Sequence, residues 1–207
     1  MSNEGKISRR RRSAQLLDVA LGLVVERGFG ELSMTAVARA AGVSKPIVYR
    51  SYPNRAALVL ALLRREQKRT DRTLDAAIPT EPGDRHPREL LVGVTDEILA
   101  AVERDPLTWR LVLMPPEGTP RAVRELVERR RNQLVKRARR LVGWGVPYLQ
   151  TEEELDLDLL ARALVSIVET QARLLLSDPE GGRERMVSSI EALIGAVGWR
   201  PEPRPGS

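Results

Sequence analysis

The sequence predicts an all-α protein in which a small three-helix head precedes a larger helical body, with about nine helices in total. Apolar residues recur three or four positions apart along most of the 207 residues, which is the spacing of one helix face. No stretch alternates apolar and polar residues as a half-buried strand does. Glycines and prolines separate the periodic segments, so helices and short connections are expected throughout.

The head is predicted to contain one long helix and two short ones. The first helix carries apolar residues on one face from Leu16 onward and ends at Gly28, because glycine accepts the left-handed conformation that closes many helices. The short helices are expected at 34–41 and 45–52, each after a serine that can cap its free N–H groups. The two serines and the glycine that ends the first short helix are Ser33, Ser44 and Gly42.

A long helix is expected to connect the head to the body. It begins after Pro53, where Asn54 can cap it, and its sequence changes from apolar to highly charged before residue 74. The segment 79–87 holds three prolines, a glycine and the only histidine, so it is predicted to be a loop.

Caps divide the rest of the body into further helices. Asp105 and Thr119 each precede a proline, which suits the first position of a helix, and Thr151 with Glu154 forms a capping box that is expected to open another one. The expected helices are 88–104, 106–114, 120–142, 151–177 and 186–197. The predicted domains are 1–53, with a basic arm, and 54–200, followed by a disordered tail at 201–207.

Basic charge is concentrated near the N-terminus. Residues 1–70 hold 14 Lys and Arg against 5 Asp and Glu, a net charge of +9, whereas residues 71–207 hold 20 against 23, a net charge of −3. A cationic head on a near-neutral body is typical of proteins that bind the phosphates of nucleic acid through the head.

The spacing of small and apolar residues from Met34 is that of a helix-turn-helix. A small residue at the fifth position lets the second helix cross closely, and a glycine at the ninth takes the left-handed turn. An αα-turn unrelated to DNA is the alternative that this spacing alone leaves open. The residues at positions 4, 5, 8, 9, 10 and 15 are Val37, Ala38, Ala41, Gly42, Val43 and Val48.

The segment from Phe29 to Leu58 resembles the DNA-binding head of the TetR family of transcriptional regulators. The resemblance covers about residues 8–63, and the rest of the chain matches only in its helical pattern and length. It implies a homodimeric repressor that binds a palindromic operator on double-stranded DNA, is released by a small-molecule ligand, and dimerises through its eighth and ninth helices.

The expected DNA contacts gather around the second short helix. Ser44 and Lys45 lie at its start, where side chains and N–H groups meet phosphates or base edges. Tyr49 lies on the same face as Lys45, and the matching tyrosine of the family contacts a phosphate; packing inside the head is its alternative role. The resemblance also assigns Thr35 and Arg55 to phosphate contacts that position the head.

Some positions depart from the family's pattern or leave their role open. Pro46 and Ile47 stand where the family often has a glycine and a hydroxyl residue, which favours apolar contact with a thymine methyl over hydrogen bonding. Ser51-Tyr52 replaces a histidine–phenylalanine pair and is expected to affect packing. Arg50 is either a surface charge or a DNA contact, and the run at 9–12 is either a DNA-binding arm before the first helix or a solvated tail.

The body is expected to enclose a small-molecule pocket between its helices. Aromatic residues make up only 3% of the chain, so few side chains stand out as walls, and each candidate has a place in the core as its alternative. Such a lining suits an apolar or amphipathic effector better than a sugar or a nucleotide. The candidates are Thr95, Trp109, Arg110, Met114, Trp144, Tyr148 and Gln171.

Two apolar stripes, at 155–168 and 186–197, are long for exposed helices and are expected to pair with their copies across a two-fold axis. Dimerisation would hold two recognition helices about 34–36 Å apart, the spacing of adjacent major grooves. An effector that tilts the helix at 54–74 would then spread the heads. The expected interface residues are Leu160, Leu164, Ile167, Val168, Met186, Ile190, Leu193 and Ile194.

Other chemistry finds little support. The chain has no cysteine and a single histidine, His86, so neither a thiolate nucleophile nor a site with two imidazoles can form, and we expect no metal or cofactor. The carboxylates at 152–158 suit a helix start, and the basic run at 129–140 is either a solvated helix face or a second nucleic-acid surface. With no nucleophile–base pair and no phosphate-binding glycine loop, an enzyme is not expected.

We therefore expect a ligand-responsive repressor. The N-terminus lacks a secretory signal and no apolar run is long enough to span a bilayer, so a cytoplasmic location with no membrane contact is expected. A ligand-independent DNA-binding regulator or activator of the same fold is the alternative. The residues themselves indicate dimeric DNA binding, whereas the word repressor comes from the resemblance.

Overall fold

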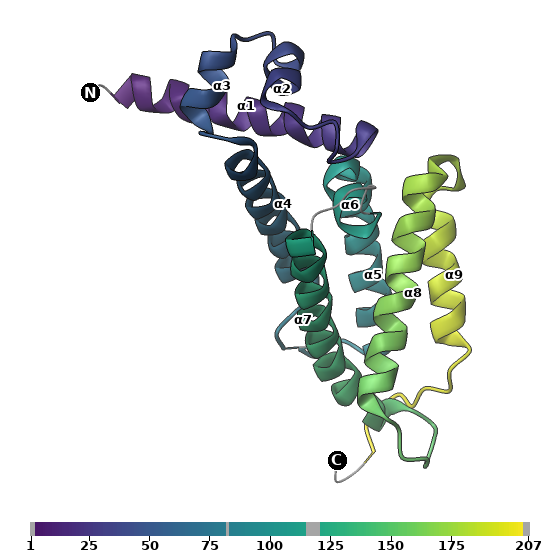
Figure 1. Cartoon of the computed structure of the whole chain (residues 1–207). Helices are drawn as coiled ribbons and strands as arrows, with labels where there is room; N and C mark the ends of the chain where they lie inside the picture. The colour runs from purple at the N-terminus through teal and green to yellow at the C-terminus, as the bar shows by residue number, and fades with distance from the viewer. Residues whose placement is uncertain (1–2, 82, 115–120, 205–207) are drawn as a thin grey trace. The chain divides into compact units, whose positions relative to one another are not determined.

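The structure, a computed structural model, describes residues 3–81, 83–114 and 121–204. Within these ranges it is helical, with two 3-10 turns, η1 (Val146–Tyr148) and η2 (Pro179–Gly181), and no strand. The α-helices are α1 (Asn3–Arg27), α2 (Met34–Ala40), α3 (Lys45–Ser51), α4 (Arg55–Ala77), α5 (Pro87–Arg104), α6 (Pro106–Leu113), α7 (Arg121–Gly145), α8 (Leu157–Ser177) and α9 (Arg183–Gly195) (Figure 1). The all-α prediction is confirmed. No helix in the described ranges has the length and apolarity needed to cross a bilayer.

The chain forms two compact units. The first contains the residues up to Asp71 together with 107–125, and the second contains 72–106 and the residues from 126 onward. Helices α4 and α7 therefore contribute to both units. The first unit extends beyond residue 53, the domain boundary expected from the sequence, because the first part of α4 packs into the core of the head.

The core of the first unit is built around α1. Helices α2 and α3 lie on α1 (Figure 1), and Phe29, Val48 and Leu58, from different segments, are each completely buried there. Gly28, with φ of 80°, turns the chain at the end of α1 as the sequence predicts. The apolar face of α1 thus serves as the platform for both short helices.

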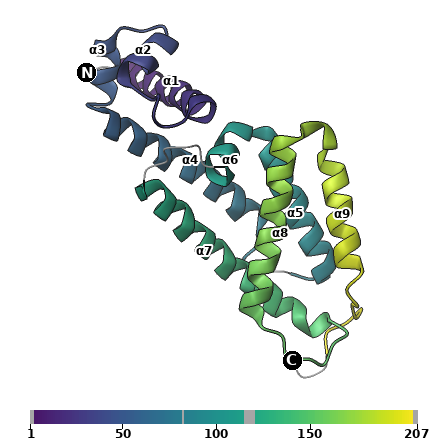
Figure 2. The same cartoon turned by 45° about the vertical axis from the view of Figure 1, so that its right-hand side comes forward.

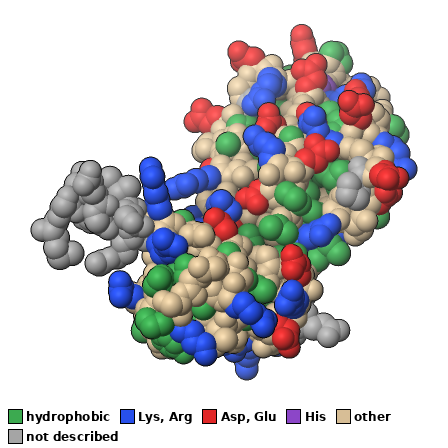
Figure 3. Space-filling model, turned by 90° about the horizontal axis from the view of Figure 1, so that it is seen from above, with side chains coloured by type: hydrophobic (Ala, Val, Ile, Leu, Met, Phe, Trp, Pro, Cys, Tyr) green, Lys and Arg blue, Asp and Glu red, His purple; other side chains and the backbone are tan. Residues whose placement is uncertain are grey.

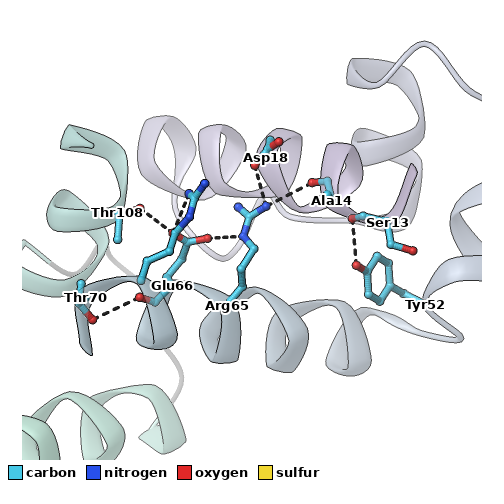
Figure 4. A network of polar contacts seen from close by, with 9 residues as sticks. Ser13, Ala14, Asp18, Tyr52, Arg65, Glu66, Thr70 and Thr108 are labelled. Atoms are coloured by element: carbon cyan, nitrogen blue, oxygen red, sulfur yellow. Dashed lines mark hydrogen bonds and ion pairs between the residues drawn. The ribbon is translucent and has the colours of Figure 1, made fainter. Parts of the chain in front are cut away.

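A buried carboxylate joins three helices of the first unit (Figure 4). Glu66 on α4 is 1% exposed; its Oε2 accepts a hydrogen bond from the Thr108 hydroxyl of α6 at 2.5 Å. Its Oε1 accepts from Nε of Arg65 at 2.5 Å, and Nη1 of the same arginine reaches the Asp18 carboxylate of α1 at 2.6 Å. Arg69 completes the group with an Nη1–Oε2 distance of 3.4 Å. Burying a charge is costly unless it is paired, so these contacts fix the register of α4 against α1 and α6.

The second unit is a helical bundle with α5 at its centre. Helix α5 packs against both α8 and α9, as Figure 2 shows. Val135 and Ala138 of α7 meet Ala161 and Val165 of α8 in one apolar cluster. A second cluster, of Ile78, Leu90 and Leu141, joins the segment after α4 to α5 and α7.

The C-terminal segment folds back onto the connection between α7 and α8. The N–H of Arg200 donates to the carbonyl of Tyr148 at 2.6 Å, and that of Arg204 to Pro147 at 2.9 Å. Nε2 of His86 lies 2.9 Å from the carbonyl of Arg200, and its ring meets those of Tyr148 and Trp199 edge-on. The tail from residue 201, expected to be disordered, is therefore hydrogen-bonded as far as residue 204.

Two helix starts differ from the sequence prediction. Helix α1 begins at Asn3, so the basic run at 9–12 lies inside the helix instead of before it. Helix α8 begins at Leu157, six residues after Thr151, because the Asp156 carboxylate accepts hydrogen bonds from the N–H groups of Asp158 and Leu159 and so provides the cap. The predicted turn and cap at 115–120 lie outside the described residues.

We predict that the Glu66 contacts contribute strongly to stability. Glu66→Ala removes one of the two carboxylates that pair with the Arg65 side chain, which is only 19% exposed, and should lower the free energy of unfolding by about 3 kcal/mol. Thr108→Val removes one hydrogen bond and should cost about 1 kcal/mol. Urea denaturation at one protein concentration measures both.

The control is Arg162→Gln, which breaks an exposed ion pair with Asp158 on α8. It should cost less than about 0.5 kcal/mol, because solvent screens such pairs. A loss for Glu66→Ala no larger than that of this control would contradict the importance of the buried carboxylate.

Candidate nucleic-acid interface

Helices α2 and α3 form the helix-turn-helix that the residue spacing predicts. The Ser33 side chain caps α2 by accepting a hydrogen bond from the Ala36 N–H at 3.0 Å. Gly42 adopts a φ of 63°, and the N–H of Val43 donates to the carbonyl of Ala38 at 3.0 Å across the turn. Val48 is fully buried and anchors α3 from its inner side. The left-handed glycine is confirmed, and Val37, Ala38 and Val48 are buried, whereas Ala41 and Val43 are half-buried.

The outer face of α3 carries most of the predicted DNA contacts. Ser44, Lys45, Pro46 and Arg50 are exposed, and Ile47 is half-buried. Tyr49 is 50% exposed, so it is not a packed aromatic of the head. The Ser44 side chain makes no capping hydrogen bond, which differs from the sequence prediction. Pro46 lies in the first turn, where a backbone N–H has no acceptor within the helix, so its missing N–H costs nothing. This face therefore combines two cations, hydroxyls and apolar surface.

The end of α3 is tied to α1 by Tyr52. Its hydroxyl donates a hydrogen bond to the carbonyl of Ser13 at 3.0 Å, and the side chain is 8% exposed. Burial raises the pKa of Tyr52 above its usual value of 10.0, because a phenolate would lose its hydration there. The Ser51-Tyr52 pair thus acts in packing, as expected.

Arg55 supports the turn before α2. Its Nε donates to the carbonyl of Leu32 at 2.6 Å and its Nη2 donates to the carbonyl of Phe29. The sequence reasoning missed this role, because only the fold brings Arg55 beside the segment 28–33. Its assignment to a phosphate, like that of the exposed Thr35 on α2, stays a prediction.

Basic side chains are not confined to the outer face of α3. Lys and Arg side chains are spread over the surface seen in Figure 3 and are interspersed there with acidic ones. Arg10, Arg11 and Arg12 are exposed on α1. The feature that distinguishes α3 is therefore its set of exposed contact side chains on a helix whose other side is fixed in the core.

The predicted ligand residues are divided between the two units. Trp109, Arg110 and Met114 belong to the first unit, where Trp109 is buried and Met114 is 43% exposed. Thr95, Tyr148 and Gln171 lie in the second unit. The Thr95 hydroxyl donates a hydrogen bond to the carbonyl of Leu91 at 2.9 Å. Among the seven, Trp144 lines a cavity of about 220 Å³ in the second unit. The cavity is bounded by Asp75, residues 78–80, Arg137, Arg140, Leu141 and Trp144.

Part of the predicted dimer interface is buried in the core of its own chain. Met186, Ile190 and Ile194 are at most 7% exposed, because this face of α9 packs in the core of its own unit. The expectation that these three meet a second copy is wrong on this ground. Leu160, Leu164, Ile167 and Val168 are half-buried, and Leu193 is 53% exposed. The exposed large apolar side chains of α8 and α9 are Leu159, Leu174 and Leu193, with Val197 just after α9.

We predict that the turn between α2 and α3 requires glycine at position 42 for conformational reasons. A Cβ there would meet no atom within 4 Å, but the φ of 63° is strained for other residues. Gly42→Ala should therefore lower the free energy of unfolding by about 1 kcal/mol. The control is Gly30→Ala, also exposed and open but without a positive φ, which should be neutral or slightly stabilising. Equal effects in denaturant titrations would contradict this explanation.

The chain is similar to known regulators over about half of its length. Residues 16–62 match the family model described as bacterial regulatory proteins, tetR family. The HTH-type transcriptional repressor KstR of Rhodococcus jostii is 33% identical over 107 residues, 52% of this chain and 47% of the relative. The HTH-type transcriptional activator FasR of Mycolicibacterium smegmatis is 29% identical over 107 residues, 52% of this chain and 48% of the relative. The chain spans about half the length of these curated relatives.

Solved structures extend the likeness to both units. A TetR-like transcriptional regulator from Rhodococcus sp. RHA1 matches with a TM-score of 0.71 and 28% identity, covering 89% of this chain and 93% of that one. The regulator FadR of Bacillus subtilis, solved in complex with stearoyl-CoA, has a TM-score of 0.67 at 14% identity, over 87% and 96% of the two chains, which shows a shared fold. With the helix-turn-helix of α2 and α3 formed as its spacing predicts, residues 16–62 form a DNA-binding domain of the TetR family of transcriptional regulators.

Proposed function

We propose that the protein is a ligand-responsive transcriptional repressor, which binds a palindromic operator as a homodimer in the cytoplasm and is released by a small-molecule effector. The observation that carries the DNA-binding part is the outer face of α3. Lys45, Tyr49 and Arg50 are exposed there, while Val48 and Tyr52 hold the opposite side in the core. A recognition helix with this arrangement can enter the major groove without losing its support.

The contacts on this face have separable roles. The ammonium of Lys45 and the hydroxyl of Tyr49 suit phosphate oxygens, which contribute affinity and register but little sequence preference. The apolar surface of Pro46 and Ile47 suits the methyl group of thymine. Sequence discrimination would then come from apolar fit at a few base pairs, together with the spacing of the two half-sites.

Exposed apolar side chains support dimerisation through α8 and α9. Leu159 is 65% exposed, Leu174 49%, Leu193 53% and Val197 45%. These exposed side chains are our candidates for contact with a second copy, which would bury their apolar surface. Two-fold symmetry would then supply the two recognition helices that a palindromic operator requires.

An amphipathic effector is supported by a structural relative and by the chain itself. The FadR structure holds stearoyl-CoA, which combines a long apolar chain with charged groups. In this chain the cavity beside α4 and α7 also combines apolar and charged walls. An activator or a ligand-independent regulator is the alternative, and the similarity to FasR, which is described as an activator, supports the first of these two.

The experiment that tests the DNA-binding role is selection of binding sites from random duplex DNA by the purified protein at about physiological salt. We expect recovered sites to be palindromic, with half-sites about one helical turn apart. Sites without symmetry would contradict dimeric operator binding, and recovery of no preferred sequence would contradict an operator-binding role. Salt has to be fixed because phosphate contacts alone produce affinity.

A matched pair of lysine variants tests the role of α3. Lys45→Ala should weaken operator binding about tenfold and reduce the salt dependence of log affinity by about one per head. Lys68→Ala removes an exposed lysine from α4 and should change affinity much less. Equal losses for both variants, measured by fluorescence anisotropy, would indicate a general charge effect and contradict the specific placement of α3 on DNA.

A further inference from the structure

The cavity in the second unit lies between the end of α4, the segment 78–80 and the second half of α7. Its apolar surface comes from Ile78 and Leu141, both less than 10% exposed, and from the half-buried ring of Trp144. At about 220 Å³ it is smaller than the 300–1,000 Å³ typical of sites for drug-sized ligands. The space therefore suits a small molecule with a compact apolar body.

The charged walls of the cavity are unbalanced. Arg137 forms an ion pair with Asp75, with an Nη1–Oδ1 distance of 2.5 Å. Arg140 lies one helical turn further along α7 and is exposed. In the part of the chain that the structure describes, no carboxylate lies within ion-pair distance of its guanidinium. Two guanidinium groups and one carboxylate leave the lining with one uncompensated positive charge.

We propose that this cavity binds a small organic carboxylate, which is held by the Arg140 guanidinium and packs its apolar body against Trp144, Ile78 and Leu141. The planar fork of an arginine matches a carboxylate with two parallel hydrogen bonds. A single surplus charge fits a monoanion better than a doubly charged phosphate, because Asp75 already neutralises the second arginine. The apolar wall would exclude acids that lack a hydrophobic body.

The position of the cavity also gives it a regulatory role, and this step rests on the proposed function. Asp75 belongs to α4, which is one continuous helix from Arg55 to Ala77. The same helix places Leu58 and Leu62, both fully buried, in the core of the DNA-binding unit. A ligand bound at one end of α4 therefore acts on the element that supports the recognition unit, and the bound acid is the effector that lowers operator affinity.

Direct binding of hexanoate, measured by isothermal titration with the full chain, tests the site. Hexanoate carries the expected charge on a short apolar chain, and hexanol keeps the chain without the charge. We expect hexanoate to bind at least tenfold more tightly than hexanol. Equal binding of the two, or no detectable binding of hexanoate at millimolar concentrations, would overturn the proposal.

Two neighbouring arginines supply the matched variants. Arg140→Gln should weaken hexanoate binding at least tenfold, whereas Arg139→Gln, which alters an exposed arginine outside the lining, should leave it unchanged. Both positions are exposed, so neither variant should unfold the chain, and circular dichroism checks this. Wild-type affinity in Arg140→Gln, or an equal loss in both variants, would overturn the assignment of Arg140.

The regulatory step has its own readout. Saturating hexanoate should weaken operator binding by the wild type at least fivefold and leave operator binding by Arg140→Gln unchanged. Hexanoate binding with no change in operator affinity would overturn the effector role of this cavity. Selective operator binding with no hexanoate binding would overturn the site while leaving the proposed DNA-binding function intact, so the two failures are distinguishable.

Discussion

The buried carboxylate of Glu66 is the constraint on which the first unit depends. It is held by Thr108 of α6 and by its neighbour Arg65, and that arginine in turn reaches Asp18 and the carbonyl of Ala14 on α1. A charge removed from water is tolerated only while its partners are in place, so the packing of α4 against α1 depends on the same contacts as its packing against α6. Since α3 is attached to α1 through Tyr52, the position of the recognition helix follows from these contacts. The network is not complete, because Nη2 of Arg65 is buried without a hydrogen-bond partner among the described residues.

Much of the head could be predicted from the sequence, because its structure is set by local rules. Gly28 and Gly42 take the left-handed conformations that their positions indicate, and Val48 is buried where the spacing places it. Helix boundaries were predicted less well when two caps competed. At the start of α8, the Asp156 carboxylate accepts two N–H groups, whereas the Thr151 hydroxyl accepts only that of Glu153, so the helix begins at the later cap. The basic run at 9–12 was placed outside α1 by its charge, although arginine is a good helix former and no proline interrupts the segment.

The ligand and dimer sites were harder to predict, because they depend on which face of each helix turns inward. The sequence gives α9 apolar residues on more than one side, and only packing decides that Met186 and Ile190 point into the core while Leu193 is exposed. The charged wall of the cavity could not be predicted from the sequence for a similar reason. Arg137 and Arg140 belong to a run that sequence reasoning assigns to a solvated face or a nucleic-acid surface, and Asp75 is 62 residues away from Arg137 along the chain. Trp144 could be singled out because large aromatic residues are scarce in this protein.

The C-terminal segment has a practical consequence for how the protein can be handled. Residues 198–204 form main-chain hydrogen bonds with 147–150, and Trp199 donates its indole N–H to the carbonyl of Ile194 at 2.7 Å. Cutting the chain just after α9 would strip these partners from the connection between α7 and α8 and remove the carbonyl that His86 contacts. A reporter or affinity tag is therefore better joined beyond residue 204 than at Gly195, because the later junction leaves these main-chain hydrogen bonds intact. Residues 198–204 are part of the folded body, and trimming them for crystallisation would remove the hydrogen-bond partners of residues 147–150.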